Sequence, residues 1–511
     1  MRTTRRGFLG LAVASVGALA AGCAGLNPTS TGQLVRSGLE LPRRFTVPLP
    51  LLTPLRPTST DGGRDVFEIE QRPASLEIVP GARTDLLTYG GSFPGPLIET
   101  RSGRPALVRH TNALEIPVAV HLHGGHTPAD SDGYPTDLVE PGTTREYRYP
   151  MEQRGATLWY HDHRMDFTGE QVYRGLLGVH LVRDADEEAL PLPHGDRELV
   201  LAIVDRSFDE HGQLAYPSGA QHHGGNHGGN HGGNHGAHHG VDDEHIEGVL
   251  GDVILVNGAP WPVHEVDAAR YRLRLLNGCN ARRLDLVLTP PPPDGPMFTQ
   301  VGSDGGLLTE PVPHEHLVMA QAERSDVVVD FSSYDVGTRV TLRNRFGSGS
   351  TADVMRFVVA RRASDDSAPV DRLPKRLSEI EPLDTTGARV REWSFTRGDV
   401  NGEHGWVVNG RPFDPEEMQA TVPLGETEIW RFRTDLHHPV HVHLDPFQVI
   451  ARGTQEGPGE FDHGWKDTVD VRPAEHVDVA VRFTDYAGPY LIHCHNLEHE
   501  DRMMMAAFAT V

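Results

Sequence analysis

The sequence predicts an all-β protein with three domains. Its 511 residues are too many for one ordinary domain, and about 150 residues per domain indicates about three. The 55 glycines and 39 prolines favour turns and short strands over long helices. Short β-type runs bounded by Gly and Pro begin near residue 64, and no helical pattern of 10–15 residues alternates with them. This arrangement favours β-sandwiches or barrels and disfavours a parallel α/β fold.

The β-type runs extend along most of the chain. The clearest runs are Ala106–His110, Val118–His123, Leu176–Val182, Glu198–Val204, Val253–Val256, Tyr271–Leu276, Val327–Phe331 and Val477–Phe483. Polar and Pro-rich breaks fall near 185–195 and 361–387. We therefore expect β-domains at 61–190, 191–370 and 371–511.

Residues 1–23 have the pattern of an export signal: basic residues, a short apolar run and then small residues. Arg5 and Arg6, followed by Gly-Phe-Leu, resemble a twin-arginine signal. The end at Cys23 resembles a lipoprotein cleavage box, although Ala20 stands where Leu is usual; the alternative is plain cleavage near Ala21. Residues 24–60 are expected to form a tether and an extended arm. The mature protein is thus expected in the periplasm or at the cell surface, with a membrane contact only through a lipid on Cys23.

Composition excludes several classes of protein. Asp and Glu outnumber Lys and Arg by 71 to 47, a formal charge of −24, which argues against a nucleic-acid partner. Three cysteines rule out a disulfide framework, and Cys279 is expected to be a small buried residue. The chain has 30 histidines, an excess that indicates metal binding.

One insert, Gln221–Gly240, is a GGNH repeat that cannot form a core, so we expect it to be disordered. Imidazole is the only strong metal ligand in it, so weak capture of copper, zinc or nickel is one hypothesis. The alternative is a flexible polar loop without metal. Its histidines are His222, His223, His227, His231, His235, His238 and His239.

Outside the insert, histidines gather in four short clusters at strand-like runs. Because side chains alternate along a strand, each His-x-His pair directs both imidazoles to one face. Four pairs in one chain are a strong metal signal. The clusters are His121-Leu-His123, His161-Asp-His163, His438-Pro-Val-His441-Val-His443 and His493-Cys-His495 with the following NLEHEDRMM.

The same alternation separates two sites. Cys494 should point away from His493 and His495, and His438 should point away from His441. One site then has paired imidazoles and the other a thiolate with imidazoles. A Cys, two His and a weak Met are the ligands of a blue-copper electron-transfer site.

These motifs resemble those of the three-domain multicopper oxidases, particularly the spore-coat laccase and bilirubin oxidase type. FPGPLIE, HLHGG, SDGYPTDL, LWYHDH, QVGSDGGLL and GWKDT extend the resemblance from about residue 40 to the C-terminus, without the insert. It implies three cupredoxin-like Greek-key domains and four coppers. It also implies dioxygen and a small-molecule reductant as partners, and a monomer.

Carried over by position, the resemblance implies the ligands of each copper. The type 1 copper would take His438, Cys494, His499 and Met504, with Met503 and Met505 as packing neighbours. The type 2 copper would take His121 and His441. The type 3 pair would take His123, His161, His163, His443, His493 and His495. Glu500 and Asp132 match the positions of carboxylates that supply protons.

The expected activity is therefore that of a laccase-like oxidase, which couples one-electron oxidation of phenolic or similar reductants to reduction of dioxygen to water. Two alternatives remain open. One is a cuprous oxidase in copper tolerance, favoured by the export signal and the His-rich insert but not by the 10 methionines. The other is a copper-binding electron carrier without oxidase activity, which would need only the type 1 ligands.

Overall fold

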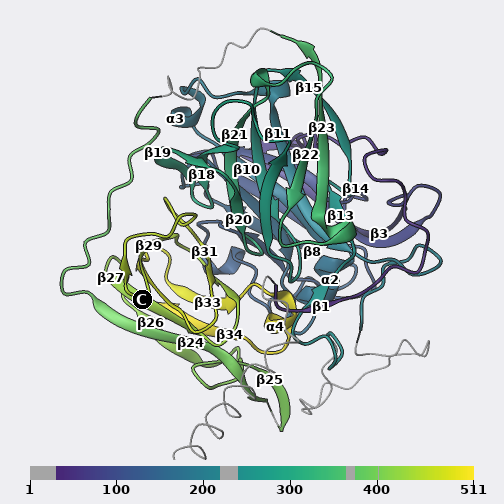
Figure 1. Cartoon of the computed structure of the whole chain (residues 1–511). Coiled ribbons are helices and arrows are strands. Elements are labelled where there is room, and N and C mark those ends of the chain that lie inside the picture. Colours follow the sequence, from purple (N-terminus) through teal and green to yellow (C-terminus); the bar gives the residue numbers. More distant parts are fainter. Residues whose placement is uncertain (1–29, 219–239, 364–373, 401) are drawn as a thin grey trace, which may run out of the picture.

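The structure is a computed structural model that describes residues 30–218, 240–363, 374–400 and 402–511. The expected export signal with Cys23, and the His-rich insert up to His239, lie outside the described residues. Nearly all regular structure consists of short strands arranged as three pairs of sheets (Figure 1). The fold class is therefore all-β with cupredoxin-like domains, as the sequence predicts, and every β-type run named above overlaps a strand.

The first pair of sheets contains the strands nearest the N-terminus in sequence, β2 to β10. One sheet orders the strands β2-β3-β6-β8 with β4 paired to β3, and the other orders them β5-β10-β9-β7. The bounds are β2 Ser59–Asp61, β3 Arg64–Leu76, β4 Thr84–Tyr89, β5 Gly95–Arg101, β6 Ala106–Asn112, β7 Val120–His123, β8 Thr144–Tyr149, β9 Ala156–Asp162 and β10 Leu177–Arg183, with the helices α2 Thr168–Tyr173 and α3 Ala185–Glu188.

The middle pair is larger. Its sheets run β14-β13-β11-β16-β21-β18-β19 and β15-β23-β22-β17-β20. The bounds are β11 Glu198–Arg206, β13 Val253–Val256, β14 Ala259–Pro260, β15 Val263–Ala268, β16 Arg270–Asn277, β17 Leu284–Thr289, β18 Phe298–Ser303, β19 Gly306–His314, β20 Leu317–Met319, β21 Arg324–Asp330, β22 Arg339–Asn344 and β23 Asp353–Arg362.

The C-terminal pair runs β25-β24-β27-β32-β29-β30 and β26-β34-β33-β28-β31. The bounds are β24 Arg389–Val400, β25 Glu403–Val408, β26 Met418–Val422, β27 Thr427–Thr434, β28 His438–Val442, β29 Phe447–Arg452, β30 Gln455–Glu456, β31 Thr468–Val471, β32 His476–Arg482, β33 Gly488–Cys494 and β34 Met505–Thr510, with helix α4 Leu497–Asp501. In Figure 1 these green and yellow strands lie below the middle domain.

Local sequence explains these strands. In β27, Glu428, Trp430 and Phe432 are buried, and the alternate residues lie further out, namely Ile429, Arg431 and Arg433. This is the period-two pattern of a strand with one core face. In β11, both faces are mostly buried, which is typical of a strand with other parts of the molecule packed on both sides of its sheet.

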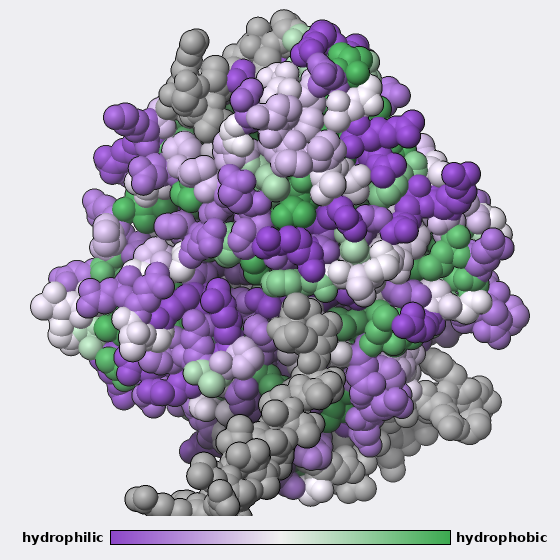
Figure 2. Space-filling model, viewed as in Figure 1, coloured by the Kyte–Doolittle hydropathy of each residue, from purple (hydrophilic) through white to green (hydrophobic). Residues whose placement is uncertain are grey.

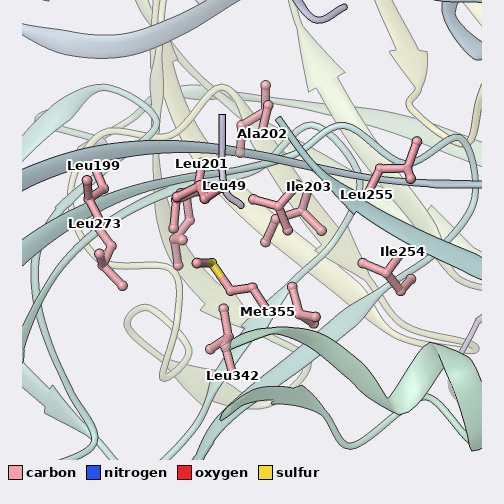
Figure 3. Close-up of a cluster of buried hydrophobic side chains, with 14 of the residues drawn as sticks. Leu49, Leu199, Leu201, Ala202, Ile203, Ile254, Leu255, Leu273, Leu342 and Met355 are labelled. Carbon is pink, nitrogen blue, oxygen red and sulfur yellow. The ribbon is translucent and has the colours of Figure 1, made fainter. Parts of the chain in front are cut away.

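The extended arm before the first domain packs on the middle domain. Leu49 is buried among Leu201, Leu273 and other apolar side chains of that core (Figure 3). Further back, β1 (Gln33–Leu34) pairs in parallel with β12 (Val249–Leu250). The arm precedes the first domain in sequence but packs on the middle domain.

Hydrophilic side chains cover most of the face shown in Figure 2, with small scattered apolar groups. Of the described helices, none is long and apolar enough to span a membrane.

Candidate metal centres

A small site forms where β28, β33 and α4 meet. Cys494 Sγ lies 3.4 Å from His438 Nδ1 and 3.6 Å from His499 Nδ1, and the two imidazole nitrogens are 3.0 Å apart. All three residues are fully buried, and burial raises the pKa of the Cys494 thiol well above its usual value. A thiolate here needs a cation beside it, and a soft metal with thiolate and imidazole ligands meets that need.

The methionines beside this site differ in their packing. Met504 belongs to the same buried hydrophobic cluster as Cys494. Backbone hydrogen bonds connect it to two residues of the small site: Met504 N donates to His499 O at 3.0 Å, and Cys494 N donates to Met504 O at 3.1 Å. Met503 and Met505 instead pack around Phe413 in a separate cluster. Only Met504 of these three thus lies in the core that holds the thiol.

Three further residues cover the small site, and no motif in the sequence indicates them. The Trp406 ring lies over His499, with centroids 3.9 Å apart. Asp435 Oδ1 is 3.0 Å from His438 Nε2, and this carboxylate is one-third exposed. The carbonyl oxygen of Glu247, from the middle domain, is 3.1 Å from His499 Nε2.

A second, larger site brings together eight imidazoles from the first and last domains. Antiparallel pairing sets His121 opposite His161 in β7 and β9, and His441 opposite His493 in β28 and β33. Every one of these imidazoles is at most 1% exposed. Their ligand atoms converge in the groups His121–His441–His443, His123–His161–His495 and His163–His443–His493.

The nitrogens of this cluster fit metal ions. Nε2 of His121, His161 and His441, and Nδ1 of His123, have no hydrogen-bond partner although they are buried. An unpaired buried nitrogen costs free energy unless a ligand satisfies it. Burial also lowers the pKa of these imidazoles, to about 3 for His161, which leaves them neutral and able to bind a metal.

The opposite nitrogens are held by fixed oxygens. His121 Nδ1 donates to Asp132 O at 2.6 Å, and His161 Nδ1 donates to Asp162 O at 2.7 Å. His443 Nδ1 lies 2.7 Å from Asp132 Oδ2. Partners of this kind fix the tautomer and orientation of metal-binding histidines, so the arrangement is typical of a metal site.

Both predicted carboxylates touch the cluster. The Glu500 oxygens lie 3.2 Å from His163 Nδ1 and 3.2 Å from His493 Nδ1. Burial would raise the pKa of Glu500, but these imidazoles outweigh burial and hold the pKa well below its usual value. Burial raises the pKa of Asp132 well above its usual value. One carboxylate therefore favours the ionised form and the other the protonated form.

The two sites are adjacent in sequence. Cys494 belongs to the small site, and its neighbours His493 and His495 belong to the cluster of eight. The strand alternation in β33 directs these side chains to opposite faces. A continuous covalent path therefore joins the sites.

Cys279 is buried, and neither it nor Cys494 forms a disulfide in the described part of the chain. Asp467 lies in the GWKDT motif, whose sequence alone indicates no role for this carboxylate. In the structure, Asp467 Oδ1 lies 3.0 Å from His123 Nε2.

The chain matches known proteins over most of its length. Multicopper oxidase family models match residues 72–187 and 379–511. The chain is 34% identical to a bilirubin oxidase of Albifimbria verrucaria over 91% of this chain and 81% of that protein, and 33% identical to a laccase of Bacillus stratosphericus over 90% and 98%.

Solved structures give the same result. A laccase from Pediococcus acidilactici has a TM-score of 0.80 at 29% identity, covering 93% of this chain and 96% of that one. The McoA multicopper oxidase of Aquifex aeolicus has a TM-score of 0.77 at 30% identity, covering 92% and 100%. The chain therefore belongs to the multicopper oxidase family and is a copper-dependent oxidoreductase of the laccase type, with dioxygen as electron acceptor.

Proposed function

We propose that the chain holds four copper ions and couples the one-electron oxidation of phenolic or related aromatic reductants to the reduction of dioxygen to two waters. The type 1 copper would be held by His438, Cys494, His499 and Met504. The type 2 copper would be held by His121 and His441, and the type 3 pair by His123, His161, His163, His443, His493 and His495. The single observation that carries this proposal is a buried Cys–His–His site joined through β33 to eight converging imidazoles.

When bound, copper supplies one-electron redox chemistry and the affinity for dioxygen. The chain fixes the positions of the ligands and excludes water from them. Cys494 offers electrons a through-bond route to His493 and His495, so an electron accepted at the small site has a short path to the cluster.

Reduction of one dioxygen to two waters uses four electrons and four protons. Glu500 lies between two cluster imidazoles, and Asp132 holds His443 through its carboxylate and His121 through its carbonyl. We propose that both carboxylates pass protons to the cluster, because a general acid must lie within hydrogen-bond reach of its site.

Copper stoichiometry tests the proposal. The oxidase should bind four coppers per chain, whereas an electron carrier should bind one. Cys494→Ser should abolish the blue colour and lower oxygen uptake driven by a phenol to background, while the cluster keeps its copper. Oxygen uptake that survived in Cys494→Ser would contradict the type 1 assignment.

A second candidate is oxidation of cuprous ion. Asp435 favours it, because a partly exposed carboxylate on His438 would attract a cation rather than a neutral phenol. Oxygen uptake with cuprous ion and with a phenolic dye, over matched concentration series, separates the two. A far higher kcat/KM for cuprous ion, lowered selectively by Asp435→Asn, would favour this candidate.

We also propose that the twin-arginine signal exports the protein, which works outside the cytoplasm as a monomer. Cell fractionation of the full chain and of Arg5→Lys/Arg6→Lys tests export. Retention of Cys23→Ala in the membrane fraction would contradict a lipid anchor on Cys23.

A further inference from the structure

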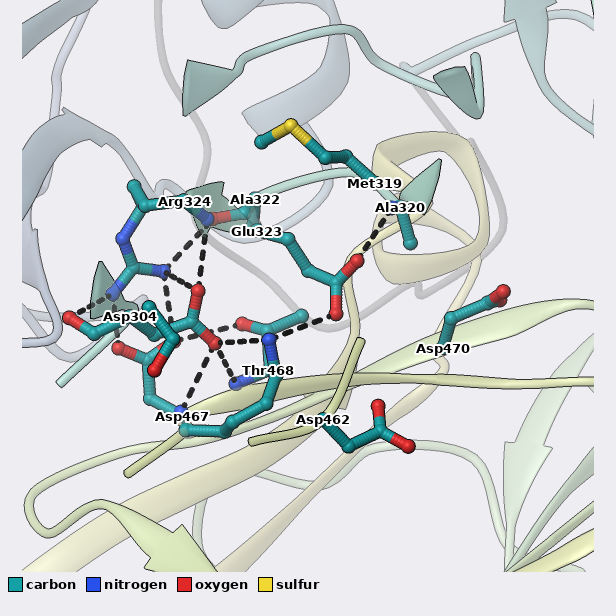
Figure 4. Close-up of polar contacts among 12 residues, drawn as sticks. Asp304, Met319, Ala320, Ala322, Glu323, Arg324, Asp462, Asp467, Thr468 and Asp470 are labelled. Atoms are coloured by element: carbon teal, nitrogen blue, oxygen red, sulfur yellow. Dashed lines mark hydrogen bonds and ion pairs between the residues drawn. The ribbon is translucent and has the colours of Figure 1, made fainter. Parts of the chain in front are cut away.

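The middle domain supplies none of the proposed ligands, yet one of its side chains binds Asp467, a residue that contacts the cluster. Arg324 begins β21, and its side chain is fully buried. Its guanidinium forms a two-pronged ion pair with Asp467 of the last domain: Nη1 donates to Oδ1 at 2.8 Å and Nη2 donates to Oδ2 (Figure 4). A planar guanidinium fixes the orientation of a carboxylate in a way that a lysine cannot.

The same guanidinium also contacts the first domain. Arg324 Nε donates to Thr157 O at 2.9 Å, on the strand that carries His161. Gly124, next to His123, packs against the ion pair, since a Cβ there would lie 2.8 Å from Arg324 Nη2 and 2.7 Å from Asp467 Oδ2. One arginine therefore connects all three domains beside the cluster.

Asp467 transmits this position to two imidazoles. Its carboxylate Oδ1 accepts from His123 Nε2 at 3.0 Å, and its main-chain oxygen accepts from His441 Nδ1 at 2.8 Å. The rings of His123 and His441 stack with centroids 3.7 Å apart. Thr468 Oγ1 donates to the same Oδ1 at 2.9 Å, which further restrains it.

This contact determines which nitrogen His123 presents. The carboxylate occupies Nε2 of His123, so Nδ1 is the unpartnered nitrogen. His121, His161 and His441 are bonded at Nδ1 and leave Nε2 unpartnered. His123 therefore differs from these three in tautomer, and Asp467 is the cause.

Further charges hold Arg324 itself in place. Asp304 Oδ1 accepts from the Arg324 amide at 2.8 Å. Lys466 Nζ lies 3.0 Å from Asp304 Oδ2 and 3.0 Å from Glu323 Oε1. Figure 4 shows these polar contacts, with Asp304 and Arg324 close to Asp467 and Thr468.

We propose that Arg324 is a positioning residue for the copper cluster: it fixes Asp467, which fixes the tautomer of His123 and the orientation of His441. The inference rests on the proposed assignment of these histidines as copper ligands. The small site has no contact with Arg324, so its blue copper should be indifferent to this residue.

The test compares holoenzyme carrying Arg324→Met or Arg324→Lys with a matched control, Arg272→Met. Arg272 is an equally buried arginine of the middle domain, and its Nε donates to Asp326 at 2.8 Å. The readouts are copper per chain after a chelator challenge, the electron paramagnetic resonance signal of type 2 copper, and the blue absorption of type 1 copper.

Both Arg324 variants should hold cluster copper about 10- to 100-fold more weakly and show an altered type 2 signal. Without Arg324, Asp467 no longer holds His123 and His441 in place, and loss of an outer partner of a metal ligand has effects of this size. Their blue absorption, and KM for the reductant, should stay as in the wild type while kcat falls. Arg272→Met should be less heat-stable but keep the wild-type signals.

Wild-type copper retention and type 2 signal in both Arg324 variants, or in Arg324→Lys alone, would overturn the inference. Equal loss of both kinds of copper in Arg324→Met and Arg272→Met would also overturn it, because the effect would then be general destabilisation. Fewer than four coppers in the wild type would instead contradict the proposed function.

Discussion

At the scale of single residues, two buried glutamates two residues apart in helix α4 differ in what they touch. Glu500 contacts the imidazoles of His163 and His493. Glu498 instead accepts hydrogen bonds from Asn280, Tyr216 and the amide of Val249. Burial raises the pKa of Glu498 to about 7, whereas the imidazoles lower that of Glu500. Contact with the cluster, rather than burial, therefore distinguishes Glu500, for which we propose a proton role, from Glu498.

Glu500→Gln should lower kcat for oxygen reduction about 10²- to 10⁴-fold, the range for loss of a general acid or base. It should leave the KM of the reductant and the blue colour nearly unchanged, because the Glu500 carboxylate contacts imidazoles of the cluster rather than the three residues of the small site. The measurement is steady-state oxygen uptake with saturating reductant.

Glu498→Gln is the matched control, since it makes the same substitution in the same helix. It should lower thermal stability without a comparable loss of kcat. Equal losses of kcat in the two variants would contradict a specific proton role for Glu500.

At the scale of elements, sequence reasoning works where the information is local. The β-type runs match strands because a short apolar or β-branched run bounded by Gly and Pro is a signal that neighbouring residues carry. The grouping of the His-x-His pairs is also readable, because side chains alternate along a strand. Arg324 and Asp467 are different: they are 143 residues apart, and only the packing of three domains brings them together. No periodicity in either segment signals that contact.

Strand β6 buries a histidine that takes no part in the metal sites. His110 is surrounded by the rings of Tyr89, Tyr147 and Tyr160, and its Nδ1 lies 2.9 Å from Gln71 Nε2 on β3. Burial lowers its pKa to about 3, from 6.5 in an unfolded chain. The buried His110 therefore makes the free energy of unfolding depend on pH.

The sign follows from proton uptake. Below pH 6.5 the unfolded chain protonates this imidazole and the folded chain does not, so the free energy of unfolding falls by about 1.4 kcal/mol per pH unit until about pH 3. His110→Gln removes this dependence. The stability advantage of the wild type over His110→Gln should therefore shrink as pH falls from 6.5 to 4.5, as measured by denaturant titration at each pH.

The exposed His211 provides the control. The free energy of unfolding of His211→Gln should change with pH in the same way as that of the wild type. A constant difference between the wild type and His110→Gln would show that the buried imidazole does not contribute to acid sensitivity.

At the scale of the whole molecule, the cluster of eight imidazoles lies on the junction between the first and last domains. Four come from β7, β9 and the residue after β9, and four from β28, β33 and the residues that follow them. The largest apolar core instead centres on the middle domain, with Leu49 of the arm inserted (Figure 3). Copper bound at the junction would therefore join two domains that share no β-sheet among the described residues.

Copper removal should consequently destabilise the molecule unevenly. An ion bound only by the folded state adds about 4 kcal/mol to stability when its free concentration is 1,000 times Kd. Its removal also leaves the buried nitrogens of His121, His161 and His441 unpaired. Differential scanning calorimetry of chelated protein should thus resolve a lower-temperature transition for the first and last domains, while the middle domain unfolds near its original temperature.

Hydrogen exchange of the backbone amides should rise on copper removal in β7, β9, β28 and β33 but not in β11 or β16. Cys494→Ser removes only the type 1 site, so slow hydrogen exchange at the junction should persist in this variant. A uniform rise in exchange across all three domains on chelation would contradict the prediction that copper stabilises the first and last domains selectively.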